Sequence, residues 1–263
     1  MTARPRHVLV CSGLDPSGGA GLLLDSRIVA EAGARPLGVV TAHTVQSTQG
    51  VSAAHPMDPE VLEAQLSLLL DDVEVHAAKL GMLGSQAVAE VLGAALERVA
   101  GPVVWDPVLA PSRGRIAMYA GSVEAAFAAL RPSLTLLTPN AMEAGLLAGL
   151  EVRDADDALA AARRLRELGE CAVLVKGGHL AEASPEVSLD LLLTLDDRVV
   201  ELSGPRVAGG EHVHGTGCAL ASSIAAQLAL GASLEEACRD AKADVARRIA
   251  AAVHPGRGAP ALG

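Results

Sequence analysis

A short glycine-rich turn near the C-terminal end of the chain leads into a helix with almost no polar face. The turn is His214-Gly215-Thr216-Gly217-Cys218, and the helix is expected to end at Gly231. The first N–H groups of a helix have no partner within it and carry partial positive charge, so they can hold an anion. Glycines also let a phosphate approach the backbone closely. The stretch therefore predicts either an anion site or a turn of small residues before a buried helix.

Cys218 would lie in the first turn of this helix. The helix field there favours the thiolate over the thiol. The alternative is an inert cysteine in a core helix. The stretch does not match the dinucleotide-binding fingerprint, because Leu220 stands where the third glycine is required.

Four polar side chains lie where predicted strands end, namely Asp106, Asn140, Glu143 and Lys176. The carboxylate of Asp106 is a hard oxygen ligand that could position Mg²⁺ through water. Lys176 could neutralise phosphate charge, or it could be an ordinary solvated lysine. Asn140 and Glu143 have the spacing of a helix capping box, so a role in the site and a purely structural role both stay open.

Further polar candidates lie beside a glycine-rich loop or follow the next strand. Asp15 is either a site residue or the start of an Asx turn, and Asp25 is either a site residue or a solvated helix position. Gln46 either hydrogen-bonds a ring or belongs to an ordinary loop. The pair His212-x-His214 has a spacing found in metal sites, but no third ligand is evident.

Composition indicates a globular protein and argues against several classes of function. Half of the 263 residues are hydrophobic and a fifth are charged, which provides ample core. Phe, Trp and Tyr occur once each, so stacking on nucleic-acid bases is not expected. The net charge of −10 argues against nucleic acid and anionic membranes as partners. The sequence has no P-loop, no His-Glu-x-x-His and no nucleophile elbow.

The spacing of the cysteines indicates the compartment in which the protein works. All four are far apart and none forms a Cys-x-x-Cys pair, which suits a reducing cytoplasm and argues against structural zinc. No signal-type apolar run and no stretch of membrane-helix length is found. A cytoplasmic protein is expected.

Strands and helices alternate along most of the chain. Strands are predicted at 7–13, 36–44, 77–82, 102–109, 134–137 and 172–175, with an antiparallel pair at 189–193 and 199–202. Helices are predicted at 21–32, from 59, from 86, from 141 to 148, near 158–169, after Cys218 and from 234 to about 253; residues 45–51 are expected to be a polar segment. The alternation predicts a single α/β domain over residues 1–263 with a mostly parallel sheet.

Polar or glycine-rich segments follow the predicted strands at 13–21, 41–50, 81–84, 106–114, 138–143 and 176–179. Ligands of such sheets bind at the carboxyl ends of the strands. These segments are therefore expected to converge on one cleft, with the turn at 214–218 as its floor.

Together these segments resemble the ribokinase-like superfamily, and within it the hydroxymethylpyrimidine/phosphomethylpyrimidine kinases of thiamine biosynthesis. The resemblance runs from Val8 to about Arg257, and it rests on seven segments that occur in the family's order. They are Ser12-Gly13-Leu14-Asp15-Pro16-Ser17-Gly18-Gly19-Ala20-Gly21, Thr41 to Val51, Lys79-Leu80-Gly81-Met82-Leu83, Asp106-Pro107-Val108, Leu137-Thr138-Pro139-Asn140-x-x-Glu143, Val173-Leu174-Val175-Lys176-Gly177-Gly178-His179 and His214-Gly215-Thr216-Gly217-Cys218.

The resemblance implies a three-layer α/β/α fold, ATP and Mg²⁺ as cofactors, a small pyrimidine as substrate and a homodimer. The implied catalytic residues are Cys218, Gly215, Gly217 and Lys176, with Cys218 at the position of an aspartate base in much of the superfamily. The implied substrate-binding residues are Gly13, Asp25, Gln46 and Met82. The implied ATP and phosphate contacts are Thr216, Asn140 and Lys176, and the implied magnesium network includes Asp106 and Glu143.

The sequence departs from the family pattern at a few positions. Ser47 replaces the usual Asn, His43 is unusual in its strand, Arg113 adds a charge after the Asp106 segment, and His212-Val213-His214 replaces Asn-Thr-His.

Three functions remain in competition. The first is ATP-dependent phosphorylation of 4-amino-5-hydroxymethyl-2-methylpyrimidine and then of its monophosphate. The second is a pyridoxal or pyridoxine kinase of the same superfamily, since pyridoxine also carries a hydroxymethyl group on an aromatic ring. The third is a catalytically silent pyrimidine-binding protein, against which the presence of Cys218, Asp106 and Lys176 argues.

Overall fold

The computed structural model describes residues 5–109, 118–177 and 186–263. Within these residues nine strands form one sheet in the order β3-β2-β1-β4-β5-β6-β7-β8-β9. The strands are β1 (His7–Leu14), β2 (Arg35–Ser47), β3 (Gly50–Pro56), β4 (Ala77–Leu80), β5 (Val103–Trp105), β6 (Leu136–Leu137), β7 (Ala172–Val175), β8 (Val187–Leu193) and β9 (Val199–Pro205). The run from β2 to β7 is parallel, whereas β3, β8 and β9 pair antiparallel at the two edges. The predicted, mostly parallel sheet is confirmed.

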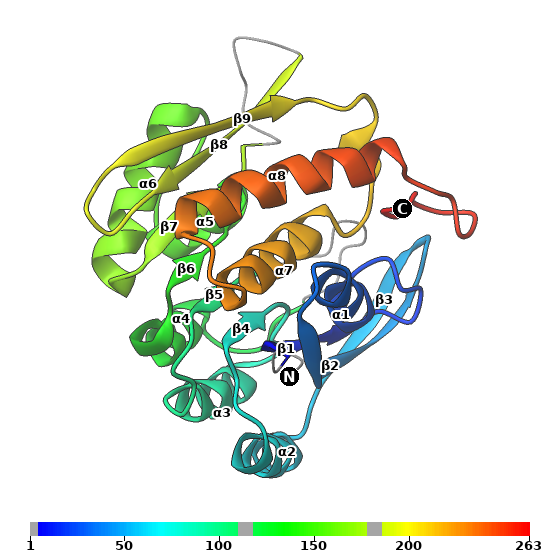
Figure 1. The fold of residues 1–263 in the computed structure, drawn as a ribbon, viewed down its shortest axis with the longest axis vertical. Coiled ribbons are helices and arrows are strands. Elements are labelled where there is room, and N and C mark those ends of the chain that lie inside the picture. Colours follow the sequence, from blue (N-terminus) through cyan, green and yellow to red (C-terminus); the bar gives the residue numbers. More distant parts are fainter. Residues whose placement is uncertain (1–4, 110–117, 178–185) are drawn as a thin grey trace.

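Helices cover both faces of the sheet (Figure 1). On one face lie α1 (Gly21–Glu31), α7 (Thr216–Ala229) and α8 (Leu234–Ala250). On the other lie α2 (Pro59–Asp72), α3 (Gln86–Leu96), α4 (Val123–Leu130), α5 (Ala141–Ala148) and α6 (Ala155–Gly169). Strand β1 is apolar on both sides: Val8 and Val10 pack toward α1 and α7, while Leu9 and Cys11 pack toward the opposite helices. This is the expected three-layer α/β/α fold.

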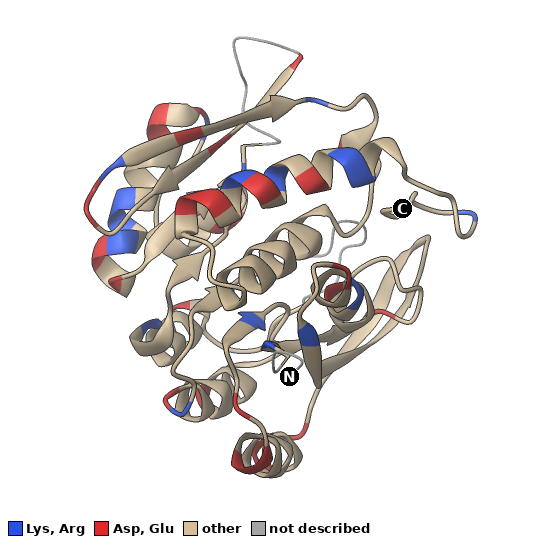
Figure 2. Ribbon diagram, in the orientation of Figure 1, with Lys and Arg blue, Asp and Glu red and all other residues tan. Residues whose placement is uncertain are grey.

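Helix α7 lies between the sheet, α1 and α8, and this position explains its composition. It carries no charged residue and is tan throughout in Figure 2, whereas the outer surface of α8 carries both signs of charge. A helix packed on several sides has no solvated face to hold a charge. Among the described residues, every helix is too short or too polar to cross a membrane.

Two segments differ from the prediction. Residues 45–51 are not a polar loop, because β2 continues to Ser47 and turns back into β3 as an antiparallel hairpin. The hairpin lies at the edge of the sheet, where side chains face solvent and the apolar signal of a strand is weak. Helix α4 is not among the predicted elements. The Arg113 loop and His179 fall outside the described residues.

Candidate active site

A cavity of about 560 Å³ opens at the carboxyl ends of the parallel strands. It receives side chains from loops after β4, β5, β6 and β7, from the β2–β3 hairpin and from the start of α7. With one exception, every residue predicted for the site lines this cavity: Gly13, Gln46, Met82, Asp106, Asn140, Glu143, Lys176, Gly215, Thr216, Gly217 and Cys218. The predicted convergence on one cleft is therefore observed.

The floor of the cavity is the N-terminus of α7. Gly215 takes the left-handed conformation with φ 88°, and a Cβ there would collide with the carbonyl oxygen of Gly19. A Cβ on Gly217 would lie 3.2 Å from Lys176 Nζ and 3.6 Å from Asp106 Oδ2. The bare Gly217 backbone therefore faces a lysine ammonium directly. Helical N–H groups and a cation beside a shared space form an anion cradle that a side chain would fill.

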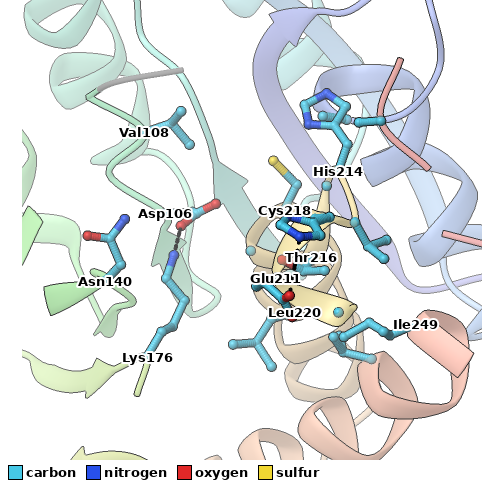
Figure 3. A pocket seen from close by; sticks show the side chains of 18 of the residues that line it. Asp106, Val108, Asn140, Lys176, Glu211, His214, Thr216, Cys218, Leu220 and Ile249 are labelled. Carbon is cyan, nitrogen blue, oxygen red and sulfur yellow. Dashed lines mark hydrogen bonds and ion pairs between the residues drawn. The ribbon is translucent and has the colours of Figure 1, made fainter. Parts of the chain in front are cut away.

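Lys176 is held opposite this turn by two carboxylates, of which Figure 3 shows Asp106. Its Nζ lies 2.6 Å from Asp106 Oδ1 and 3.8 Å from Glu143 Oε2. Burial lowers the pKa of Lys176, but the charges of Asp106 and Glu143 outweigh burial and raise it. The lysine is therefore a fixed cation.

Glu143 has both of the roles that its spacing left open, the structural one in a capping box and the one in the site. Its Oε2 accepts a 2.8 Å hydrogen bond from the Asn140 N–H, and the Asn140 side chain accepts one from the Glu143 N–H, so the capping box is present. The same carboxyl faces Lys176. Burial raises the pKa of Glu143 to about 7, with the Lys176 charge opposing and the Asp106 charge adding to the rise.

The carboxyls of Asp106 and Glu143 are the hard oxygen donors that Mg²⁺ prefers. In the part of the chain that the structure describes, no group of three or more His, Cys, Asp or Glu forms a metal cage. Proteins often hold Mg²⁺ with one or two carboxylates together with waters and substrate phosphates. The donor set beside the α7 turn fits that kind of site.

Cys218 lines the cavity in the first turn of α7, as predicted, but it is not held as a thiolate. Burial raises its pKa to about 12; Lys79 lowers it, and Asp25 and Asp106 raise it further. The thiol is therefore the favoured form of Cys218, although the helix field acts in favour of the thiolate. Loss of hydration outweighs the helix field here.

Asp25 is the exception among the predicted site residues. It is fully buried beneath the site and does not line the cavity. Its carboxylate pairs with Lys79 Nζ at 2.6 Å and accepts a 2.8 Å hydrogen bond from Ser222. The sequence analysis left Asp25 as a possible solvated position and did not identify Lys79 or Ser222, since only the tertiary packing joins β4, α1 and α7 at this point.

One end of the cavity is suited to a small ring. Met82, Met118 and Ala42 form an apolar cluster with Val108 packed against it. Gly13 lies beside Met82, where a Cβ would come within 3.0 Å of the sulfur. The polar group at this end is Gln46, which contacts His214.

The other end of the cavity lies against α8 and β9, where Val245 and Ile249 form an apolar wall. Nearby, Lys242 Nζ pairs with Asp190 at 2.8 Å, and Asp190 accepts a 2.8 Å hydrogen bond from the Gly177 N–H. Asp190 thus fixes the backbone next to Lys176. The sequence contains a signal for it, because an acid inside the apolar strand β8 needs a partner.

The two histidines of the His-x-His pair face different partners. His212 is exposed and contacts Glu211, whereas the ring of His214 contacts Asp15. No metal group that includes them is formed by the described residues. The metal hypothesis for this pair gains no support from the geometry.

Comparisons with known proteins identify relatives of this chain. The family model described as phosphomethylpyrimidine kinase matches residues 15–262. A hydroxymethylpyrimidine/phosphomethylpyrimidine kinase of Mycobacterium tuberculosis is 39% identical over 258 residues, which is 97% of this chain and 92% of that protein. A thiamine biosynthetic bifunctional enzyme of Arabidopsis thaliana is 37% identical over 241 residues, 90% of this chain and 45% of that protein.

A solved structure shares the fold closely. The pyridoxal kinase of Staphylococcus aureus in complex with pyridoxal has a TM-score of 0.87 and 29% identity, covering 99% of this chain and 94% of that one. The same kinase is also known with AMP-PCP, an ATP analogue. The family match over residues 15–262 and the identity to the mycobacterial kinase show that this chain belongs to the phosphomethylpyrimidine kinase family.

Proposed function

We propose that this protein is an ATP-dependent kinase of thiamine biosynthesis. Its substrate is 4-amino-5-hydroxymethyl-2-methylpyrimidine, which it converts to the monophosphate and then to the diphosphate. The observation that carries this proposal is the bare Gly217 backbone at the start of α7, facing Lys176 and Asp106 within the cavity. An anion cradle between a ring-sized apolar end and a second apolar wall suits phosphoryl transfer between two bound molecules.

The charges of the site fit this chemistry. Phosphoryl transfer depends mainly on positioning and on stabilising the charge of the transferred group. The N–H groups of Gly215 to Cys218 and the Lys176 ammonium would hold that group, and Lys176 would exchange part of its contact with Asp106 for phosphate oxygens. Bound Mg²⁺, held by Asp106 and Glu143 through water, would neutralise phosphate charge.

The other residues of the cavity would bind the pyrimidine and the nucleotide. Gly13 and Met82 would pack on the pyrimidine, and Gln46 would pair with its ring nitrogen and exocyclic amine. Thr216 and Asn140 would contact phosphates, and the wall at Val245 and Ile249 would take the adenine. Asp25 would not contact the pyrimidine directly. It would act through its ion pair with Lys79, which is buried below the cavity.

Cys218 is proposed as the residue that receives the proton of the attacking hydroxyl. With a pKa raised to about 12 it rests as a thiol, so it acts only in its thiolate fraction. The second phosphorylation starts from a phosphate that is already ionised. It therefore depends less on this residue.

A second candidate function is phosphorylation of pyridoxal or pyridoxine. The close structural match to the Staphylococcus aureus enzyme favours it. The two substrate classes differ where Gln46 would contact them, because the aminopyrimidine offers an acceptor beside a donor and pyridoxine does not.

A substrate panel tests the proposal. Purified protein with ATP would be offered the hydroxymethylpyrimidine, its monophosphate, pyridoxal, pyridoxine and pyridoxamine, with and without Mg²⁺, and products followed by phosphorus NMR. Formation of the diphosphate from both pyrimidines, only with Mg²⁺, is expected. Turnover of the pyridoxal series alone would replace the proposal by the second candidate, and no turnover would favour a silent binding protein.

We also propose a homodimer in the cytoplasm. The cysteines among the described residues are free, which suits a reducing compartment. Sedimentation equilibrium at several concentrations tests the dimer.

A further inference from the structure

Gln46 at the ring end of the cavity is in contact with a buried acid through a histidine. His214 Nε2 lies 3.1 Å from Gln46 Nε2 and 3.0 Å from Asp15 Oδ2. On its other side, Gln46 Oε1 lies 3.1 Å from the hydroxyl of Thr44, which also lies 2.8 Å from the carbonyl oxygen of Leu14. All of these residues except Leu14 line the cavity.

The proton on His214 is fixed by Asp15. Burial raises the pKa of Asp15, but the hydrogen bonds from His214 and Ser17 outweigh burial and lower it. An ionised carboxylate only accepts hydrogen bonds. His214 Nε2 must therefore carry a hydrogen and donate it to Asp15, whether the ring is neutral or doubly protonated.

This proton decides the orientation of the Gln46 amide. A nitrogen that carries a hydrogen cannot accept one, so the Gln46 atom beside His214 Nε2 must be the carbonyl oxygen. Turning the amide by 180° exchanges its oxygen and nitrogen without moving the rest of the side chain. The amide nitrogen then donates to Thr44 Oγ1, and the single Thr44 hydroxyl hydrogen donates to Leu14. The single hydrogen on His214 Nε2 is then shared between Asp15 Oδ2 and the Gln46 carbonyl oxygen, as a three-centre hydrogen bond, and every contact joins a donor to an acceptor.

We propose that His214, held by Asp15, is a specificity-determining residue that locks the Gln46 amide and makes the cavity select aminopyrimidines. The locked amide keeps one N–H and one carbonyl lone pair in a fixed order beyond the contacts named above. A ring with an acceptor nitrogen next to an exocyclic amine matches that order. This inference rests on the proposed pyrimidine kinase activity, and His214 acts through Gln46 as a positioning residue.

Asp15→Asn is the sharpest test, because it changes the proton pattern without changing the shape. The N–H and hydroxyl of Ser17 donate to Asp15 Oδ1 at 2.9 and 2.7 Å, so the carbonyl oxygen of the new amide stays there. Its nitrogen then faces His214 Nε2 and donates to it. The histidine becomes an acceptor at Nε2, and the lock on Gln46 is lost.

The kinetic readout is the ratio of two substrates. In Asp15→Asn and in His214→Gln, the KM for the hydroxymethylpyrimidine should rise about tenfold or more, as expected for a lost hydrogen-bond pair. The KM values for pyridoxal and ATP should change little, and kcat should fall less than KM rises. The matched control is Ser52→Ala, which removes a hydroxyl from the same hairpin outside the cavity and should leave all constants unchanged. Equal effects on both rings would overturn the proposal.

A second measurement does not depend on turnover. Long-range ¹⁵N NMR of histidine-labelled protein reports which ring nitrogen carries hydrogen, and the His214 signal is identified among the eight histidines by its loss in His214→Gln. Nε2 should be protonated in the wild type and unprotonated in Asp15→Asn. An unprotonated Nε2 in the wild type would overturn the proposal even if the pyrimidine is a substrate. Failure of the wild type to use either pyrimidine would instead remove the proposed function, while the NMR would still report on the lock.

Discussion

At the scale of single residues, the site places one carboxyl in two roles. Glu143 closes the capping box of α5 and also faces Lys176. The capping role fixes the carboxyl at one place, and burial at that place raises its pKa to about 7. A structural hydrogen bond and an electrostatic role are therefore not alternatives at this position.

The stability of the protein should report the pKa of Glu143. The raised pKa means that the folded protein binds the Glu143 proton more tightly than the unfolded chain does. This difference adds to the free energy of unfolding below about pH 4.5, and the added stability is lost as the pH rises through 7. The Glu143→Gln variant does not titrate at this position, so its free energy of unfolding does not fall with pH for this reason. Relative to wild type, the variant should gain up to about 3 kcal/mol in free energy of unfolding between pH 5 and pH 8.

Urea denaturation at the two pH values without Mg²⁺ measures this difference. The control is Glu124→Gln, a helix-start acid that is exposed and whose pKa is lowered, so its difference should stay constant over this range. A constant difference for Glu143→Gln as well would mean that Glu143 is already ionised at pH 5.

Cys218 should show its role in the pH dependence of the first phosphorylation. If its thiolate is the base, kcat/KM for the alcohol rises about tenfold per pH unit below the thiol pKa. Cys218→Ala should remove that slope and lower the rate at pH 8 by about 100-fold or more, with a smaller effect on the monophosphate. Steady-state kinetics from pH 6 to 9 measures both.

Another cysteine, Cys238 of α8, provides the control for that experiment. Cys238 is buried in the core, and its pKa is also raised to about 12, but it does not line the cavity. Cys238→Ala should therefore keep the wild-type pH profile. Near-full turnover by Cys218→Ala would show that Cys218 is structural.

At the scale of elements, α7 joins the core to the site. Its middle is buried among the sheet, α1 and α8, so its position is fixed by packing. Its first turn carries the two glycines at the cavity floor. The packing therefore determines where the anion cradle lies relative to Lys176.

The two glycines should respond differently to the same substitution. Gly215→Ala meets both a positive φ and the carbonyl of Gly19, so it should lower the melting temperature by several degrees or more. Gly217→Ala has no positive φ and meets the flexible end of Lys176 at 3.2 Å, so it should fold normally. Its methyl group fills the cradle, and kcat should fall about 100-fold.

Calorimetry and turnover on both variants separate these outcomes. Each variant is the control for the other, since both add one methyl group to the same turn. Full activity in Gly217→Ala would show that phosphate does not bind at this turn.

At the scale of the whole molecule, the C-terminal tail connects distant parts of the site. The Ala259 N–H donates to Thr48 in the β2–β3 hairpin at 2.7 Å, and the His214 N–H donates to Pro260 at 2.8 Å. The tail thus ties the hairpin that carries Gln46 to the turn before α7. Figure 1 shows the C-terminus beside this hairpin.

Displacing the tail should therefore affect substrate binding from outside the cavity. A Cβ at Gly258 would collide with the carbonyl oxygen of Thr48, so Gly258→Ala should push the tail from the hairpin. The KM for the pyrimidine should rise several-fold, with a smaller effect on kcat. Arg257→Ala changes the exposed neighbouring residue without adding a contact, and its kinetics should match wild type. An unchanged KM in Gly258→Ala would show that the hairpin keeps its position without the tail.

The sequence by itself determined the alternation of strands and helices and most of the cavity wall. Apolar strands ending in Asp106, Asn140 or Lys176 place these residues at one edge of a parallel sheet, because parallel strands all point the same way. The turn at Gly215 and Gly217 was recognisable because unpaired N–H groups and glycines follow from local sequence alone. The edge hairpin was missed, since its exposed side chains leave a weak apolar pattern. Helix α4 was not predicted, although Ala126, Phe127 and Leu130 on one of its faces are buried.

Only the tertiary structure decided the charge states and the pairings between distant segments. Asp25 of α1 meets Lys79 of β4 between that helix and the sheet, and Asp15 meets His214 almost two hundred residues later in the chain. Neither pairing has a spacing that a sequence could show. The thiol state of Cys218 likewise depends on burial, which is a property of the packed molecule. Local sequence fixes backbone dipoles and side-chain types, whereas desolvation and partner choice arise only when the layers close over the site.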